Sequence, residues 1–324
     1  MTGKLRIGAL GNSRVLSRFM PASQSHSVGQ IEIIATRSQQ SAEVARERYP
    51  DRLVVVGYEE LLEREDVDAI YVCLPPALHF LWAKKSLEAG KHVLIEKPAV
   101  LTANEAVTLG QIASSNQLLA MEAWWYRFHP LIHSLRQLIA SGVLGNIKHV
   151  SSSFSYVNSD PKDSRWISEL GGGALYDMFS YHIDFLNYVL GIRNQDIDLI
   201  QAFASKQSGV DACVAAELIT HSGTVCNFMA GLNKPSLCKT FIIGDQGSVE
   251  VPHVRVLPEF VQASYIYYSH QGPQVVEFPQ MDAYILMLKN FSQSCVNRLE
   301  SPVLIEDTVA NTLLLERVKA AIDE

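Results

Sequence analysis

Short apolar segments alternate with helix-like segments through the first third of this 324-residue chain. Strand-like composition occurs at residues 4–10, 31–36, 53–56, 69–74, 92–95 and 118–122. Alternation at this cadence is typical of right-handed βαβ units, which build a parallel sheet. We therefore predict an α/β Rossmann fold, a doubly wound parallel sheet, for a dinucleotide-binding domain over residues 1–123.

The pattern changes after residue 148, where longer alternating runs are joined by short turns such as 221–223 and 245–247. Consecutive strands with short connections indicate an antiparallel sheet. Residues 124–324 are thus expected to form a C-terminal α+β domain with a large, mainly antiparallel sheet that binds substrate. Its open face could carry the interface of a homodimer or a dimer of dimers. The docking partner of the final helix, residues 306–321, cannot be inferred from the sequence.

Composition limits the possible partners and compartments. The apolar fraction is 48% and the net charge is -7, without a Lys/Arg cluster, so nucleic acid is not an expected partner. The five cysteines show no metal-binding spacing and are expected to be reduced. We found no signal peptide and no membrane-spanning segment, which favours a cytoplasmic protein without a membrane partner.

A charged pair ends the apolar run at residues 92–95. Glu96, Lys97 and Pro98 follow that run at the carboxyl edge of the predicted sheet, where open α/β sheets bind ligands. Pro98 restricts the backbone of Lys97 to an extended conformation. Glu96 and Lys97 are therefore candidates for a cofactor site, and Lys97 also for catalysis. The alternative is that Lys97 is a surface charge at the end of a strand.

A glycine turn joins the first strand to the first helix. The residues of this turn that could hold a cofactor are Gly8, Gly11, Asn12, Ser13 and Arg14. A strand, a turn and a helix N-terminus suit a pyrophosphate, because the first helical turn has unpaired N–H groups. The dinucleotide fingerprint is degenerate, however: Ser13 stands at the position of its second glycine and Leu16 at that of its third. The alternative is that these two substitutions weaken cofactor binding.

The residues after the second strand bear on the choice of nicotinamide cofactor. NAD-binding sites place an acidic residue there to bind the ribose 2′-hydroxyl, whereas this chain has Thr36, Arg37 and Ser38. An arginine flanked by hydroxyls can neutralise a 2′-phosphate. We therefore expect NADP(H) to be preferred over NAD(H). The alternative is that Arg37 is a solvated loop charge.

Several motifs together resemble those of the Gfo/Idh/MocA family, nicotinamide-dependent oxidoreductases that act mostly on sugars, cyclitols and related alcohols. The resemblance rests on the glycine turn and on residues 75–79, 89–98, 121–130 and 171–184, so it covers essentially the whole chain. The motifs are most similar to those of dimeric dihydrodiol dehydrogenases, xylose dehydrogenases and glucose-fructose oxidoreductase. Each motif alone is weak, and their order and spacing make the resemblance specific.

The resemblance implies further residues at the cofactor edge: Leu74, Pro75, Pro76, His79 and Arg127. Pro76 departs from the asparagine common in the family, so a contact from this position must be apolar or use its carbonyl. His79 could instead only pack and cap its turn. His129 and His133 lie four residues apart without a third ligand, so no metal site is expected.

The resemblance also implies a catalytic helix after the glycine run 171–173. Helical spacing places Asp177, Tyr181 and Asp184 on one face. The position four residues after the aspartate is often histidine in the family and is tyrosine in the branch named above. Tyr181 would therefore be the acid/base, with Lys97 favouring its phenolate and Asp177 orienting the pair. A buried tyrosine hydrogen-bonded in the core is the alternative.

The candidate substrate-binding residues are Trp125, Phe154, Arg165, Trp166 and His182. Trp125 is the candidate for stacking on a sugar or diol ring, although interdomain packing would also explain it. Phe154 and Trp166 have structural roles as their alternatives. Together these features predict an NADP(H)-dependent enzyme that interconverts an alcohol and a carbonyl on a sugar or cyclic diol. The rival hypothesis is a catalytically weak or inactive dinucleotide-binding sensor of the same fold.

Overall fold

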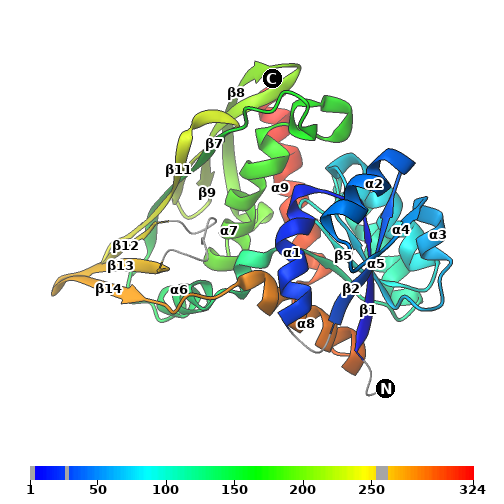
Figure 1. The fold of residues 1–324 in the computed structure, drawn as a ribbon. Helices are drawn as coiled ribbons and strands as arrows, with labels where there is room; N and C mark the ends of the chain where they lie inside the picture. The colour runs from blue at the N-terminus through cyan, green and yellow to red at the C-terminus, as the bar shows by residue number, and fades with distance from the viewer. Residues whose placement is uncertain (1–3, 26–28, 253–261) are drawn as a thin grey trace. The chain divides into compact units, whose positions relative to one another are not determined.

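The chain forms two compact units in the computed structural model, which describes residues 4–25, 29–252 and 262–324 (Figure 1). The first unit combines Met1–Trp125 with Asp282–Val309, and the second combines Tyr126–Met281 with Ala310–Glu324. The predicted division after residue 123 did not anticipate that Asp282–Val309 returns to the first unit. The physical reason is that the helix in this segment packs against the first and second strands.

The first unit contains a six-stranded, fully parallel sheet in the order β3-β2-β1-β4-β5-β6. Its strands are β1 (Leu5–Leu10), β2 (Gly29–Thr36), β3 (Leu53–Val56), β4 (Ala69–Val72), β5 (His92–Ile95) and β6 (Ala120–Glu122). This order confirms the predicted doubly wound sheet. All six strands end at one edge, so the turns after β1, β2, β4 and β5 meet there.

Helices cover the sheet of the first unit. They are α1 (Arg14–Ser25), α2 (Gln39–Arg48), α3 (Tyr58–Leu62), α4 (His79–Glu88), α5 (Ala103–Ser115) and α8 (Ala283–Asn297), followed by the start of α9 (Ile305–Asp323). α3, α4 and α5 share one apolar core with the strands. α1 packs beside α8, and Phe19 of α1 lies 4.4 Å from Tyr71 and 5.8 Å from Tyr284, measured between ring centroids. No helix was predicted at α8.

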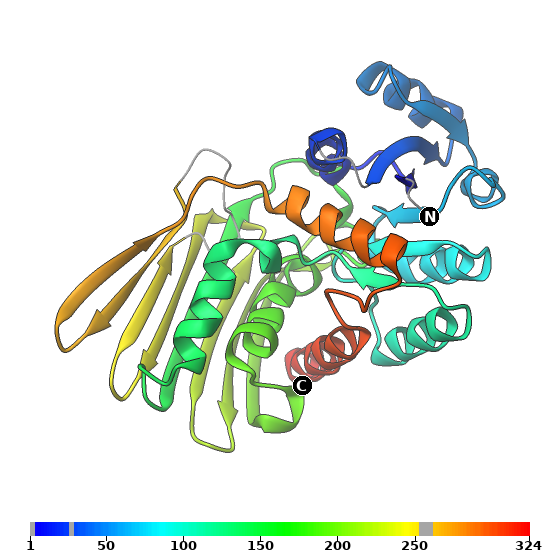
Figure 2. The ribbon, with the colours of Figure 1, turned by 90° about the horizontal axis from the view of Figure 1, so that it is seen from below.

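The second unit contains an eight-stranded sheet in the order β14-β13-β12-β11-β7-β10-β9-β8. Its strands are β7 (Ile147–Val157), β8 (Ile197–Gln207), β9 (Val210–Thr220), β10 (Val225–Gly231), β11 (Asn233–Gly244), β12 (Ser248–Pro252), β13 (Ser264–Ser269) and β14 (Gly272–Glu277). Neighbouring strands are antiparallel except for the parallel pair β7–β10. The predicted large, mainly antiparallel sheet is therefore confirmed. Helices α6 (Pro130–Ala140) and α7 (Ser180–Leu190) lie over one of its faces (Figure 2).

The two faces of this sheet differ in burial. Along β9, Val214 and Leu218 are buried, whereas Ala215 and Glu217 on the other face are not. The strand register places further exposed apolar side chains on the same face as Ala215, namely Leu199, Phe203, Ile243 and Val275. Phe203 is 75% exposed. This open face therefore exposes several large apolar side chains.

Across the three described ranges, no helix is long and apolar enough to span a bilayer. Within the same ranges, no group of three or more His, Cys, Asp or Glu side chains could hold a metal ion. All five cysteines are free, and four of them are buried. Burial raises the pKa of the Cys73 and Cys226 thiols to about 12.

Candidate active site

The turn after β1 requires glycine at position 11. Gly11 has a φ of +101°, and a Cβ there would lie 2.9 Å from Leu74 Cδ2 and 3.2 Å from the Cys73 carbonyl oxygen. The Gly11 N–H donates to the Ala35 carbonyl at 2.9 Å, which holds the turn against β2. Gly8 serves packing, since a Cβ there would lie 2.7 Å from Leu61 Cδ1. The turn therefore has the tight backbone that a phosphate cradle needs.

The start of α1 follows directly from this turn. The Ser13 hydroxyl accepts a weak hydrogen bond from the Leu16 N–H at 3.4 Å. Asn12 Oδ1 accepts from the Arg48 guanidinium at 3.4 Å, which ties the turn to α2. Arg14, the first residue of α1, is exposed. The segment that carries the degenerate fingerprint therefore still forms a strand, a glycine turn and a helix N-terminus.

The turn after β2 uses its two hydroxyl side chains locally. Thr36 Oγ1 donates to the Ser38 carbonyl at 3.1 Å, and Ser38 Oγ accepts from the Ser41 N–H at 3.3 Å as the N-cap of α2. Arg37, between them, is exposed. The hydroxyls thus shape the turn, and Arg37 is the residue of the three that extends to solvent.

His79 bridges the turns after β4 and β5. Its ring Nδ1 lies 2.8 Å from the Pro98 carbonyl oxygen, and its Nε2 lies 2.6 Å from the Leu74 carbonyl oxygen. His79 is 1% exposed, and burial lowers the pKa of its imidazole. We therefore assign His79 a structural role in place of the predicted cofactor contact, because both ring nitrogens already face the backbone. Leu74, Pro75 and Pro76 remain half-buried at this edge.

Lys97 follows β5 at the same edge and is partly buried. The Lys97–Pro98 peptide bond is cis. Glu96, directly before it, is buried and accepts a hydrogen bond from the Tyr71 hydroxyl at 2.5 Å. Burial and the charge of Glu96 raise the pKa of Tyr71 well above its usual value. Glu96 therefore anchors the end of β5, and Tyr71 is a partner that the sequence analysis missed.

Trp125 belongs to the first unit and stacks on Tyr284 of α8. Their ring centroids are 5.1 Å apart with an interplanar angle of 15°. Trp125 is 8% exposed. Tyr284 thus supports the tryptophan predicted to stack on a substrate ring, and nothing in the sequence near Trp125 pointed to this partner.

In the second unit, Asp211 of β9 caps the helix that carries Tyr181. Its carboxylate accepts from the Leu175 N–H at 2.6 Å. Gly173 has a φ of +109°, and a Cβ there would lie 2.2 Å from Asp211 Oδ1. The glycine run therefore lets the carboxylate approach the helix N-terminus, where a negative charge is favourable.

The helix begins with a π-helical turn, η5 (Leu175–Phe179), before α7. Regular helical spacing predicted one polar face for Asp177, Tyr181 and Asp184. A π-helical turn inserts an extra residue and rotates the residues that follow it. Asp177 has polar partners of its own, whereas Tyr181 and Asp184 both contact Tyr126.

The Tyr181 side chain is 6% exposed and lies among aromatic rings. Its centroid is 5.8 Å from that of Tyr126 and 5.6 Å from that of Phe154. Asp184 is fully buried and accepts hydrogen bonds from Tyr126, Arg127 and Asn311. The guanidinium of Arg127, 2% exposed, is thus committed to Asp184. We therefore assign Arg127 a structural role in place of the predicted cofactor contact.

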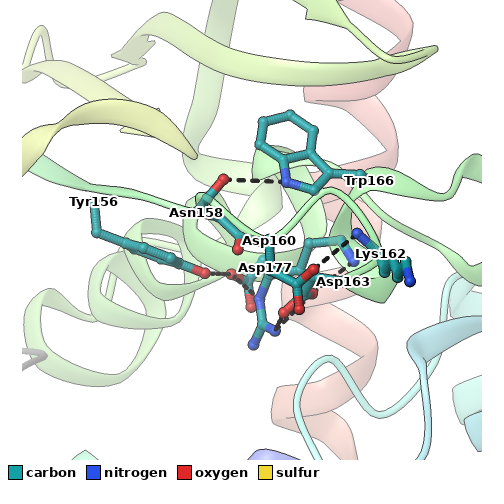
Figure 3. A network of polar contacts seen from close by, with 8 residues as sticks. Tyr156, Asn158, Asp160, Lys162, Asp163, Trp166 and Asp177 are labelled. Atoms are coloured by element: carbon teal, nitrogen blue, oxygen red, sulfur yellow. Dashed lines mark hydrogen bonds and ion pairs between the residues drawn. The ribbon is translucent and has the colours of Figure 1, made fainter.

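Asp177 lies in a polar network (Figure 3). Asp177 Oδ2 accepts from the Tyr156 hydroxyl at 2.9 Å and from Arg165 Nε at 2.8 Å. Asp163 Oδ1 accepts from Arg165 at 3.1 Å. The nearby Trp166 indole donates to the Asn158 carbonyl at 3.3 Å. Burial and the charge of Asp177 raise the pKa of the Tyr156 hydroxyl, so Tyr156 acts as a donor.

Tyr156 and Phe154 are two residues apart on β7 and therefore project from the same face of the strand. Tyr156 contacts Asp177 and Phe154 contacts Tyr181, so the polar network lies beside Tyr181. The structure thus brings Asp177, Tyr181, Phe154 and Arg165 together within the second unit. Tyr156 was missed because its only sequence signal was the alternation of β7.

His182 lies in the core of the second unit. It is 0% exposed, its Nε2 is 3.0 Å from the Met229 carbonyl oxygen, and its ring stacks on Phe228 with centroids 4.9 Å apart. The predicted substrate contact from His182 is therefore replaced by a packing role against β10.

Family models match both units. Residues 5–123 match the oxidoreductase family with an NAD-binding Rossmann fold, and residues 132–250 match the GFO/IDH/MocA C-terminal domain. The chain belongs to the Gfo/Idh/MocA family. The predicted family is therefore confirmed, and membership makes the protein an NAD(P)-dependent oxidoreductase.

Individual family members resemble the chain over most of its length. A dTDP-3,4-didehydro-2,6-dideoxy-alpha-D-glucose 3-reductase from Saccharopolyspora spinosa is 33% identical over 81% of this chain and 79% of its own. An NADP(+)-dependent D-xylose 1-dehydrogenase from Haloferax volcanii is 28% identical over 90% of this chain and 89% of its own. A crystal structure of a 3-ketoreductase from Actinomadura kijaniata with NADP and TDP-benzene has a TM-score of 0.92 and 27% identity, and the match covers 99% of this chain and 98% of that one.

Proposed function

We propose that this sugar-related oxidoreductase uses NADP(H) to interconvert an alcohol and a carbonyl group on a sugar, with Tyr181 exchanging the proton. The predicted cofactor, NADP(H), is confirmed by its presence in the similar 3-ketoreductase and in the name of the xylose dehydrogenase. A cyclic diol is the second substrate class that the sequence predicted.

The first unit fits this cofactor. The tight glycine turn at Gly11 leads directly into the start of α1, whose backbone N–H groups would hold a pyrophosphate, and exposed Arg37 stands where a 2′-phosphate is expected. Lys97 would hold the nicotinamide ribose. When bound, NADPH would supply the hydride that reduces the carbonyl carbon.

The catalytic assignment of Lys97 and Tyr181 rests on a residue spacing that the similar 3-ketoreductase shares. Solved structures of the similar 3-ketoreductase include a variant with a tyrosine replaced by phenylalanine and a variant with a lysine replaced by alanine. The two replaced residues are separated by the same number of positions as Lys97 and Tyr181. This equal spacing supports Lys97 and Tyr181 as the reactive pair of this chain.

The proton role follows from elementary acid–base chemistry. A tyrosine hydroxyl with a pKa of about 10 can donate a proton to a substrate oxygen at neutral pH. In the reverse direction it must act as a base, which an ammonium group favours by stabilising the phenolate. Lys97 would supply that charge, and Asp177, fixed by Tyr156 and Arg165, would orient the pair of Tyr181 and Lys97.

The substrate side of the proposal retains Trp125, Phe154, Arg165 and Trp166. Two carboxylates surround the Arg165 guanidinium, so the network carries no excess positive charge and suits hydroxyl groups better than phosphate. A sugar hydroxyl can both donate and accept, which matches a carboxylate next to a guanidinium. We therefore place the sugar ring, and not a phosphate, next to Asp177.

The test is turnover with a substrate panel. In the reduction direction, purified protein and NADPH are mixed with free keto-sugars, aldoses, dTDP-linked keto-sugars or cyclic diketones. In the oxidation direction, purified protein and NADP+ are mixed with sugars or trans-diols. We expect at least one sugar to change the NADPH absorbance and deuterium from labelled NADPH to appear on its carbinol carbon. NADPH binding without turnover across the panel would contradict the proposal and favour a dinucleotide-binding sensor.

We also propose that the protein forms a homodimer, or a dimer of dimers, through the open face of the second unit's sheet. The expected compartment is the cytoplasm. Phe203, Leu199 and Val275 on that face are 75%, 43% and 61% exposed. Burying such side chains in a second copy would stabilise an isologous interface. Sedimentation should show a dimer or tetramer, and Phe203→Arg should shift it toward monomer. A monomer at all concentrations would rule out this assembly.

A further inference from the structure

The backbone directly after Lys97 is held by two buried side chains of the first unit. The Pro98 carbonyl oxygen lies 2.8 Å from His79 Nδ1, and the Ala99 N–H donates to Glu122 Oε1 at 2.9 Å. His79 and Glu122 are 1% and 4% exposed. The turn that carries Lys97 is therefore fixed from two elements, α4 and the end of β6.

Glu122 extends this connection to a third element. Its second carboxylate oxygen, Oε2, accepts from the Thr308 hydroxyl at 2.8 Å, and Thr308 is 2% exposed. Thr308 lies in the part of α9 that belongs to the first unit. One carboxylate therefore joins the Lys97 turn, the end of β6 and α9.

The Glu122 carboxylate is an unfavourable group to bury between the Lys97 turn and α9. Removing a carboxylate from water is unfavourable, and apolar groups of similar volume often stabilise a core equally well. Hydrogen bonds from fixed donors, by contrast, set the direction of a backbone segment. The polar character of Glu122 thus points to control of geometry at the Lys97 turn.

We propose that Glu122 is a positioning residue for Lys97, acting through the Ala99 N–H and supported by Thr308. This inference rests on the proposed function, in which Lys97 contacts the cofactor and stabilises the reacting phenolate. The contacts that carry this role are the hydrogen bonds that Glu122 accepts from the Ala99 N–H and the Thr308 hydroxyl. A displacement of the turn would move the ammonium, and misplacements of about 1 Å can cost about 100-fold in rate.

Three variants test the two hydrogen bonds. Glu122→Met removes both, Thr308→Val removes only the bond from α9, and Glu122→Gln keeps an acceptor for the Ala99 N–H. We expect kcat to fall by about tenfold in Glu122→Met and by less in the other two, at a temperature well below the Tm of each. In the oxidation direction, the rising limb of the pH profile should move to higher pH in Glu122→Met and be restored in Glu122→Gln. The Kd for NADPH, measured by fluorescence quenching, should rise in Glu122→Met.

A double-mutant cycle with Lys97→Ala separates this inference from the proposed function. If Glu122 acts through Lys97, Glu122→Met adds little further loss to Lys97→Ala. A full tenfold additional loss would overturn the positioning role. Normal turnover in Lys97→Ala alone would instead overturn the catalytic role of Lys97.

Thr224→Val is the matched control for a purely structural contribution. Thr224 is 5% exposed and its hydroxyl donates to the Ile147 carbonyl at 2.8 Å, in the second unit. This variant should lower Tm while kcat and the pH profile stay unchanged. If the Glu122 variants behave in the same way, Glu122 only stabilises the fold and the proposal is wrong.

Discussion

The rings of Phe154 and Tyr181 are nearly perpendicular, with centroids 5.6 Å apart. Because Tyr181 packs through its ring against Phe154 and Tyr126, Tyr181→Phe should keep that packing while removing the hydroxyl. General acid–base groups contribute about 10²- to 10⁴-fold, so we expect kcat to fall on that scale with little change in NADPH affinity. Steady-state kinetics and fluorescence titration measure the two quantities.

Tyr268→Phe is the control for this prediction, because Tyr268 is a more exposed tyrosine of the same unit whose hydroxyl donates to Glu250 at 3.2 Å. It should leave kcat unchanged. The assignment of Tyr181 fails if Tyr181→Phe turns over at a near-normal rate while deuterated NADPH shows that hydride transfer limits that rate.

Lys97→Ala should lower both turnover and cofactor affinity, since we assign one ammonium two partners. The expected loss in kcat is at least about tenfold, with a weaker Kd for NADPH. Lys84→Ala removes an exposed lysine that pairs only loosely with Glu88, at 3.8 Å, and should change neither. Loss of affinity without loss of kcat would limit Lys97 to cofactor binding.

Arg37→Ala should weaken NADPH binding selectively. A charge-assisted contact to the 2′-phosphate is worth about 1–3 kcal/mol, and NADH lacks that phosphate. Calorimetric titration of both cofactors measures the difference, and Arg64→Ala, which breaks the Asp66 ion pair, provides the control. An equal loss for both cofactors would place Arg37 on the adenine, and NADH preference in the unmodified protein would reject the prediction.

His129 should make stability depend on pH in the acid range. Its Nδ1 accepts from the Leu131 N–H at 3.1 Å as the N-cap of α6, and burial lowers its pKa from 6.5 to about 4. Since the folded pKa is below the unfolded one, the stabilising contribution is complete above pH 6.5 and is lost as pH falls toward 4. The free energy of unfolding should fall by an amount on the order of 1–3 kcal/mol over this pH range.

His129→Asn provides the comparison, because asparagine keeps an acceptor at the N-cap and does not titrate. The Tm of the unmodified protein should fall more steeply than that of His129→Asn between pH 6.5 and 4. Parallel curves would show that His129 is not the group responsible.

Gly173→Ala should destabilise the second unit more than Gly209→Ala. Both glycines have positive φ, but only at Gly173 would the new Cβ clash, 2.2 Å from Asp211 Oδ1, whereas nothing lies within 4 Å at Gly209. Backbone strain alone costs about 1–2 kcal/mol, and the clash should add about 1–3 kcal/mol. Urea unfolding measures both variants, and equal losses would mean that Asp211 moves aside without cost.

The cofactor edge could be predicted from the sequence because its signals are local. Glycine turns, strand ends and Lys97 next to Pro98 each constrain a few neighbouring residues, and parallel strands bring those turns to one edge. The structural partners of this edge could not be predicted. Tyr71, Glu122 and Thr308 are buried side chains whose contacts join segments far apart in the chain.

The catalytic helix shows a different limit. Spacings of four and three residues predicted one polar face for Asp177, Tyr181 and Asp184, but the π-helical turn at Leu175–Phe179 changes the helical phase between Asp177 and Tyr181. Propensity does not reveal a π-helical turn, and the contacts of this one, the Asp211 cap and the packing against β7, β9 and β10, come from distant parts of the chain. The sequence did not reveal the burial of His182 and Arg127 for a related reason, because tertiary packing and not residue type decides what these side chains contact.

The return of Asp282–Val309 to the first unit has a consequence for how the protein is made. Phe19, which stacks on Tyr71, acquires its second aromatic partner, Tyr284, only after the whole second sheet has been synthesised. A ribosome-bound chain ending near residue 125 would therefore expose the apolar side of α1 to water. The first unit is therefore discontinuous in sequence, and the second unit's sheet, residues 147–277, is inserted between its two segments. An excised fragment of residues 1–125 would be prone to aggregate.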